Sequence, residues 1–349
     1  MSEKTLTVAV TGLNATDNPA PGVAVIRALR DARPSIRIVG LAYDALDPGI
    51  YATDLLHEVF LLPYPSQGLA AFWSRLAYVH EKVGLDVILP TLDAELPAFL
   101  DVEPRLQELG IRTLLPTREQ FTLREKGRLP KLGEKAGILV PATAVVNTIE
   151  ELGRVHHRVP YPFFVKGLYY GAQAAHTFDE ASHAFYKQVA QWGIPVIVQT
   201  QILGEEFNVV ALGDGEGGLT GAVAMKKLML TDKGKGWAGI TVRDPALLEV
   251  ARKFMSATHW RGPCEIELMR DKQGQYHLIE INPRFPAWVY LSAGAGMNLP
   301  DAAVDLAMGK KPNVAAEYQV GTLFVRISID QIARLEDFQN ITTLGEVSR

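Results

Sequence analysis

Apolar runs and helical patterns alternate through the first third of the chain. The segments 6–11, 36–43 and 86–90 are short apolar runs, as expected of strands buried on both faces of a parallel sheet. Between them, residues 23–30 and 69–83 carry apolar side chains at helical spacing. This order of strands and helices predicts an α/β domain with a doubly wound parallel sheet.

Two further regions follow in which strands and helices alternate less regularly. Two segments with many small residues, 167–175 and 231–239, are predicted to be loops. The second is a candidate lid, because glycine lowers the cost of sampling several conformations. The predicted strands are 161–166, 195–201, 208–212, 220–229 and 321–329, and the predicted helices are 179–192, 245–258 and 299–308.

A polar pattern stands out in the segment 264–284, which alternates on either side of a polar turn and predicts a β-hairpin. Side chains two apart share a face of a strand. Glu265 and Glu267 therefore point one way on the first strand, and Glu280 and Asn282 point one way on the second. Folding about the turn brings Glu267 roughly opposite Glu280. Two carboxylates and an amide oxygen suit Mg²⁺, although a half-exposed hairpin can also simply present its polar face to water.

Composition narrows the class of protein. The 349 residues are enough for two or three domains. With 35 Lys and Arg against 39 Asp and Glu, the net charge is −4 and no nucleic-acid partner is expected. The single cysteine, Cys264, rules out an internal disulfide. We see no secretion signal and no apolar run near the roughly 18 residues of a membrane span. We therefore expect a cytoplasmic protein without membrane contact.

Two lysines stand at the borders of predicted elements. Lys166 ends the strand 161–166 and precedes a glycine-containing loop, where a lysine and backbone amides can together meet phosphate oxygens. Lys126 precedes a helix that Gly137 terminates. Taken singly, each could also be a solvated surface lysine.

A nicotinamide dinucleotide site in the first domain is the main rival hypothesis. Such a site needs the spacing G-x-G-x-x-G, and the segment 11–22, TGLNATDNPAPG, lacks it. Asp44 could imitate the acidic residue that binds a ribose, but it could equally cap a loop. The segments 12–22 and 90–95 remain candidate substrate loops, since they follow strands of the predicted sheet.

The order of these features resembles the ATP-grasp superfamily, in particular its carbamoyl-phosphate-synthetase-like and biotin-carboxylase-like carboxylate–amine ligases. The resemblance covers essentially the whole chain. The matching pieces are Lys126 before Gly137-Ile138, the strand 161–166 with Lys166, the hinge 199–207, the set Glu267, Glu280 and Asn282, and Asn282-Pro283-Arg284-Phe285 with its A-G-x-N-L-P-like continuation.

The resemblance implies a role for each matching residue. The cofactors would be ATP and Mg²⁺, with Mn²⁺ as the alternative metal, and Lys166 and Arg284 would be catalytic. Lys126 and Lys166 would bind phosphates, Gln199, Thr200 and Ile202 the adenine, Glu206 the ribose, and Glu267, Glu280 and Asn282 the metal.

The resemblance also implies an architecture and a reaction. Residues 1–117 would form a Rossmann-like pre-ATP-grasp domain, 118–194 ATP-grasp subdomain A, and 195–349 subdomain B with a C-terminal segment. The two α+β subdomains would clasp ATP. The enzyme would activate a small carboxylic acid or amino acid as an acyl phosphate, form ADP, and join the acyl group to an amine. Related enzymes are commonly dimers, which makes a homodimer an option.

Three departures from the family pattern keep alternatives open. Glu125 replaces the aspartate before the first lysine, Gln199 replaces the hinge acid, and Tyr169 and Tyr170 make the loop after Lys166 aromatic instead of glycine-rich. A non-catalytic ATP-binding sensor of the same fold is therefore one alternative. A carboxylate kinase or a thioester-forming ligase is another.

Overall fold

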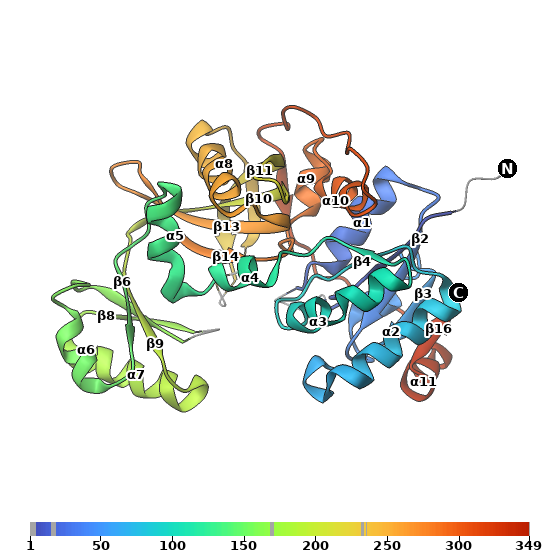
Figure 1. Ribbon diagram of the computed structural model, residues 1–349, viewed down its shortest axis with the longest axis horizontal. Coiled ribbons are helices and arrows are strands. Elements are labelled where there is room, and N and C mark those ends of the chain that lie inside the picture. Colours follow the sequence, from blue (N-terminus) through green and yellow to red (C-terminus); the bar gives the residue numbers. More distant parts are fainter. Residues whose placement is uncertain (1–4, 15–18, 168–170, 232–233, 235, 349) are drawn as a thin grey trace.

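The computed structural model describes residues 5–14, 19–167, 171–231, 234 and 236–348. Three sheets organise this part of the chain (Figure 1). The first is mainly parallel, and the other two are antiparallel. The predicted α/β class, with a parallel sheet at the N-terminus and α+β units after it, is confirmed.

The first sheet has the strand order β16-β3-β2-β1-β4-β5. Its parallel strands are β1 (Thr7–Val10), β2 (Arg37–Ala42), β3 (Glu58–Leu61), β4 (Val87–Leu89) and β5 (Arg112–Thr113). The helices of this region are α1 (Gly22–Ala32), α2 (Leu69–Val83) and α3 (Leu96–Glu108), with short 3-10 turns at Pro48–Tyr51 and Pro65–Gln67. All four residues of β1 are buried, as the apolar run predicts.

The end of the chain returns to this first sheet. After α11 (Leu335–Thr343), strand β16 (Glu346–Ser348) pairs antiparallel with β3. Figure 1 shows α11 and β16 beside α2, away from the second and third sheets. The sequence did not predict this return, since a strand of three residues carries no periodic signal.

The second sheet is four-stranded and has the order β6-β9-β7-β8. Its strands are β6 (Thr143–Val146), β7 (Phe163–Lys166), β8 (Ala172–Ala175) and β9 (Val196–Thr200), and its helices are α6 (Ile149–Val155) and α7 (Phe178–Trp192). The predicted loop 167–175 is wrong in part, because Ala172–Ala175 pairs with β7 as a strand. Alanine has a low intrinsic preference for strands, and here pairing with β7 overrides that preference.

The third sheet is six-stranded and has the order β14-β13-β10-β11-β12-β15. Its strands are β10 (Gly204–Asp214), β11 (Leu219–Leu230), β12 (Gly236–Thr241), β13 (Arg261–Asp271), β14 (Tyr276–Asn282) and β15 (Leu323–Val325). The helices of this part of the chain are α4 (Arg118–Leu123), α5 (Leu129–Ala136), α8 (Pro245–Thr258), α9 (Tyr290–Gly294) and α10 (Leu299–Ala307), and a 3-10 turn spans Lys126–Arg128. The predicted loop 231–239 is also wrong in part, because β12 begins at Gly236.

One apolar core joins the first and third sheets. Side chains of α1, such as Ile26 and Leu29, belong to the same buried cluster as Leu299 of α10 and Val209 of β10. Helices α2 and α3 cover the other face of the first sheet and form a separate cluster. The N-terminal domain is therefore fixed against the sheet that carries the hairpin. Within the described ranges, no helix combines the length and apolar character needed to cross a bilayer.

Candidate functional site

The hairpin β13–β14 has the register that the sequence predicts. Glu267 lies directly opposite Glu280, and Glu265 lies opposite Asn282. The ladder shifts immediately afterwards, between Glu267 and Leu268. All four polar side chains consequently share one face of the third sheet at the end of β14.

The amide of Asn282 is held between two of the carboxylates. Its Nδ2 donates to Glu265 Oε2 at 3.0 Å and to Glu267 Oε1 at 2.9 Å. No described residue donates to Asn282 Oδ1, so this oxygen can serve as a ligand. Across the described chain, no group of three or more His, Cys, Asp or Glu side chains is placed to hold a metal. Two carboxylates and one amide oxygen nevertheless fit Mg²⁺, which often takes its other ligands from water and substrate phosphates.

Two lysines neutralise the carboxylates of this set. Lys126 Nζ lies 3.5 Å from Glu280 Oε1. Lys227 Nζ, at the end of β11, lies 2.9 Å from Glu206 Oε2 and 3.5 Å from Glu267 Oε2. Burial alone would lower the pKa of Lys227, but Glu267 and Glu206 raise it above its ordinary value. The sequence did not single out Lys227, because a lysine at a strand end resembles a solvated one.

Lys166 faces the same region from the second sheet. Its Nζ donates to Gln199 Oε1 at 2.6 Å, across the pairing of β7 with β9. Burial, together with the nearby charge of Lys126, lowers the pKa of Lys166 to about 8, against the attraction of Glu280 and Glu267. Lys166 is thus a buried cation whose hydrogen-bond partner is neutral, and an added anion would stabilise its charged form.

The hinge 199–207 runs from the last residues of β9 into β10. Gln199 is buried, and its Nε2 donates to Thr143 Oγ1 at 3.1 Å while its Oε1 accepts from Lys166. The backbone N–H of Thr200 donates to Ala142 O. The backbone of Ile202 bonds to no described residue and is free to contact a ligand. The Gln199 amide keeps a second N–H and a second oxygen lone pair that no described residue uses.

Arg284 connects the hairpin to the N-terminal domain. Its Nε donates to Asp93 Oδ2 at 2.8 Å, and its Nη1 lies 3.7 Å from Glu265 Oε2. Burial alone would lower the pKa of the guanidinium, but Asp93 and Glu265 raise it. Asp93 belongs to the segment 90–95, which the sequence suggested only as a substrate loop. Its other oxygen, Oδ1, is buried and accepts no hydrogen bond from the described residues.

Glu265 contacts both Asn282, a predicted metal ligand, and Arg284. Its Oε1 accepts hydrogen bonds from Asn208 Nδ2 at 2.6 Å and Trp288 Nε1 at 2.7 Å. Burial, with the charge of Glu267, raises its pKa. The sequence placed Glu265 on the face of Glu267 but gave it no role. Its contacts make it a residue that orients Asn282 and Arg284.

A second buried carboxylate fixes the loop that carries Asp93. Glu95 accepts hydrogen bonds from Thr11 Oγ1, Tyr43 Oη and two backbone N–H groups of its own loop. Burial raises its pKa. This network holds the loop against strand β1, and so sets the position from which Asp93 reaches Arg284.

Some predicted features lie outside the described residues. They include Tyr169 and Tyr170, parts of the segment 12–22, and residues 232, 233 and 235 of the candidate lid.

Comparisons with known proteins show which families the chain resembles. Residues 194–327 match the family model described as "ATP-grasp in the biosynthetic pathway with Ter operon". This part of the chain is therefore similar to an ATP-grasp domain. The large chain of carbamoyl phosphate synthase from Clostridium beijerinckii is 27% identical over 221 residues, which are 59% of this chain and 20% of that relative. The chain thus spans only about a fifth of the length of this relative.

Solved structures share the fold. Biotin carboxylase from Campylobacter jejuni matches with a TM-score of 0.72 and 15% identity, covering 91% of this chain and 74% of that chain. An L-amino acid ligase from Bacillus licheniformis matches with a TM-score of 0.66 and 17% identity, covering 88% and 75%. The predicted resemblance to biotin-carboxylase-like ATP-grasp proteins is confirmed at the level of the fold.

Proposed function

We propose that this protein is an ATP-dependent ligase that activates a small carboxylic acid or amino acid as an acyl phosphate and joins it to an amine. The observation that carries the proposal is that two lysines lie near the carboxylates of Glu267 and Glu280 in the third sheet: Lys126 from a 3-10 turn and Lys166 from the second sheet. The names of the relatives and of the solved structures, which include an amino acid ligase and a complex with MgADP, support the same chemistry.

In this proposal ATP lies between the second and third sheets. Gln199, Thr200 and Ile202 contact the adenine, and Glu206 binds the ribose hydroxyls once it releases Lys227. Lys126 and Lys166 bind the outer phosphates. Glu267, Glu280 and Asn282 would hold Mg²⁺, or Mn²⁺ in its place, and the metal would supply positive charge that neutralises the phosphates. The domain division at residues 117 and 194 belongs to the same proposal, with β16 completing the first sheet.

The proposed reaction needs no nucleophile from the protein. The protein has to position the carboxylate, the terminal phosphate and the amine. A carboxylate oxygen of the substrate attacks the terminal phosphorus, ADP leaves, and an amine then displaces phosphate from the acyl carbon. Charge develops on the transferring group, so preorganised cations stabilise it. Arg284 can donate two parallel hydrogen bonds to the acyl phosphate. Asp93 and Glu265 hold its guanidinium in place before the substrate arrives.

The test is ADP release, measured over a panel of amino acids and small carboxylic acids, each with and without amine acceptors. The proposal predicts ADP release that depends on both a carboxylate and an amine, with a condensed product by mass spectrometry. ADP release with an acyl phosphate as the only product would identify a carboxylate kinase instead. Release that requires a thiol would identify a thioester-forming ligase, and nucleotide binding without any turnover would identify a sensor.

A further inference from the structure

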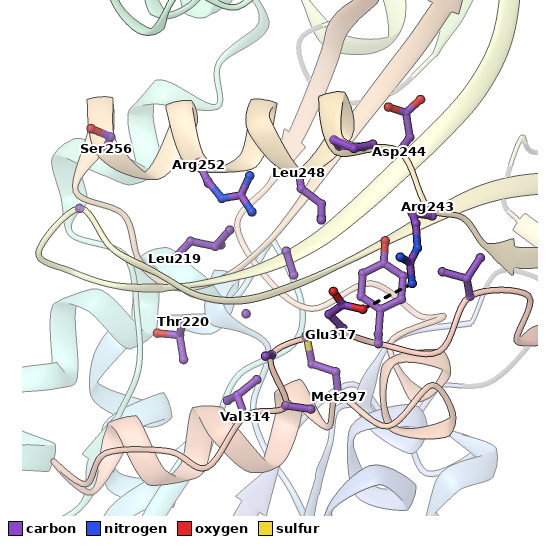
Figure 2. Close-up of a pocket in the computed structure, with 18 residues that line it drawn as sticks. Leu219, Thr220, Arg243, Asp244, Leu248, Arg252, Ser256, Met297, Val314 and Glu317 are labelled. Atoms are coloured by element: carbon purple, nitrogen blue, oxygen red, sulfur yellow. Dashed lines mark hydrogen bonds and ion pairs between the residues drawn. The ribbon is translucent and has the colours of Figure 1, made fainter.

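A cavity of about 780 Å³ lies at the opposite end of β11 from Lys227. Figure 2 shows it between helix α8, the first residues of β11 and the segment 314–320. None of the residues that line it belongs to the candidate site described above. At about 3.3 Å per residue, the five positions from Ala222 to Lys227 span roughly 16 Å. The cavity is therefore a separate feature of the third sheet.

One wall of the cavity is an open edge of the sheet. Strand β12 pairs with β11 only from Met225 onward, so the first residues of β11 have a neighbour on one side alone. The backbone of Ala224 points to the open side, where its N–H donates to Tyr318 Oη at 3.3 Å and its C=O accepts from Val242 N at 3.1 Å. Backbone groups alternate along a strand. Those of Ala222 therefore point into the cavity, and no described residue pairs with them.

The opposite wall is also backbone without sheet or helix pairing. The segment 314–317 has no helical or strand pairing, and no described residue hydrogen bonds with the backbone of Ala315 or Ala316. A shift in the β10–β11 ladder adds to the opening, because Thr220 has no partner in β10. Two lengths of unpaired backbone thus face a common space.

Side chains around the cavity supply charge and apolar contact. Figure 2 shows the guanidinium of Arg252 between Leu219 and Leu248, directed from α8 toward the cavity. Arg252 pairs with Glu249 at 3.6 Å, with both side chains more than half exposed. Exposed ion pairs contribute little to stability, so this guanidinium can bind another anion at small cost.

We propose that this cavity binds a short extended peptide that ends in a free carboxylate. The backbone of the peptide pairs with Ala222, as an added strand does at a sheet edge. Its carboxylate binds Arg252, and small apolar side chains contact Leu219 and Leu248. The volume lies within the range of small-ligand sites, which favours a peptide of a few residues over a strand of a partner protein. This inference does not depend on the proposed function.

The experiment uses fluorescence anisotropy with the whole protein and a fluorescein-labelled tetrapeptide of alanine and valine with a free C-terminal carboxylate. Saturable binding is expected, equal in the presence and absence of ATP. Arg252→Gln should weaken it about tenfold, because a charge-assisted hydrogen bond is lost. Arg118→Gln removes a similarly exposed, ion-paired arginine from another part of the chain and should change nothing.

Two modified peptides separate the parts of the proposal. A C-terminal amide should bind as weakly to the unaltered protein as the free peptide binds to Arg252→Gln. A peptide methylated at its backbone nitrogens should also bind more weakly, because it loses donors to the strand edge. The proposal is overturned if no binding occurs at about 1 mM peptide, if the modified peptides bind as well as the parent, or if ATP competes with the peptide.

Discussion

Arg284 and Asp93, 191 positions apart in the sequence, form an ion pair with 2.8 Å between Nε and Oδ2. The pair joins the loop after β4 to the segment that follows the β13–β14 hairpin. It brings the N-terminal domain to the point where the proposed acyl phosphate would form. The arginine is held on its other side by Glu265.

The first prediction concerns the stability that this pair provides. Arg284→Ala leaves the carboxylates of Asp93 and Glu265 without their cation, and the free energy of unfolding should fall by about 3 kcal/mol. Adding Asp93→Asn should recover part of that loss, because one of the unpaired charges disappears. Urea denaturation of the single and double variants measures both effects. A loss below about 0.5 kcal/mol, typical of an exposed pair, would show that the pair is structurally unimportant.

A second prediction separates the chemical role of Arg284 from its structural role. Arg284→Lys keeps the positive charge but loses the planar pair of donors. Nucleotide affinity should therefore stay near that of the unaltered protein, while product formation should fall by about 100-fold. Binding is measured by calorimetry and product by mass spectrometry. A large loss of nucleotide affinity would instead place Arg284 on the nucleotide.

The third prediction uses the lowered pKa of Lys166. In the free protein this pKa is about 8, so about half of the molecules carry a neutral Lys166 at pH 8. Phosphate oxygens favour the charged form, so nucleotide binding should take up about half a proton at pH 8 and almost none at pH 6.5. Calorimetry in two buffers of different ionisation enthalpy measures the uptake.

The matched control is Lys166→Arg, since arginine stays charged over this range. Proton uptake at pH 8 should disappear in this variant. If uptake is unchanged, another group is responsible and Lys166 does not meet the phosphates.

A fourth prediction concerns Glu265, which contacts Asn282 and Arg284 without being a predicted ligand. Glu265→Gln replaces one acceptor oxygen by a donor and so disturbs the orientation of Asn282. Apparent Mg²⁺ affinity, measured by titrating nucleotide binding with the metal, should fall about tenfold, as for other residues that orient metal ligands. Unchanged Mg²⁺ affinity in a folded variant would remove Glu265 from this role.

Local sequence patterns predicted most of the fold. Within the candidate site they predicted the arrangement of the hairpin carboxylates. The helices Leu69–Val83 and Pro245–Thr258 have the predicted bounds, because their apolar spacing is uninterrupted and each follows a clear break. The opposition of Glu267 and Glu280 was also predictable, since a hairpin with one polar turn sets its own register. These features depend on residues close in sequence.

The contacts that were missed depend on pairing between distant segments. Lys166 meets Gln199 only because β7 pairs with β9, and Lys227 meets Glu206 only because β11 pairs with β10. Nothing near Asp93 indicates that it faces Arg284. The roles of all these residues in binding and catalysis stay predictions, because they concern ligands and not the fold.

The most direct test of the account is the effect of Mg²⁺ on the binding of a non-hydrolysable ATP analogue, compared between the unaltered protein and Glu280→Gln. The account predicts that Mg²⁺ tightens binding at least about tenfold in the unaltered protein and has little effect in the variant. Glu205→Gln lies on strand β10, which pairs with β13, and removes a carboxylate paired with Lys226; this variant should keep the full Mg²⁺ effect. An equal Mg²⁺ effect in Glu280→Gln and the unaltered protein would contradict the assignment of the metal to this hairpin.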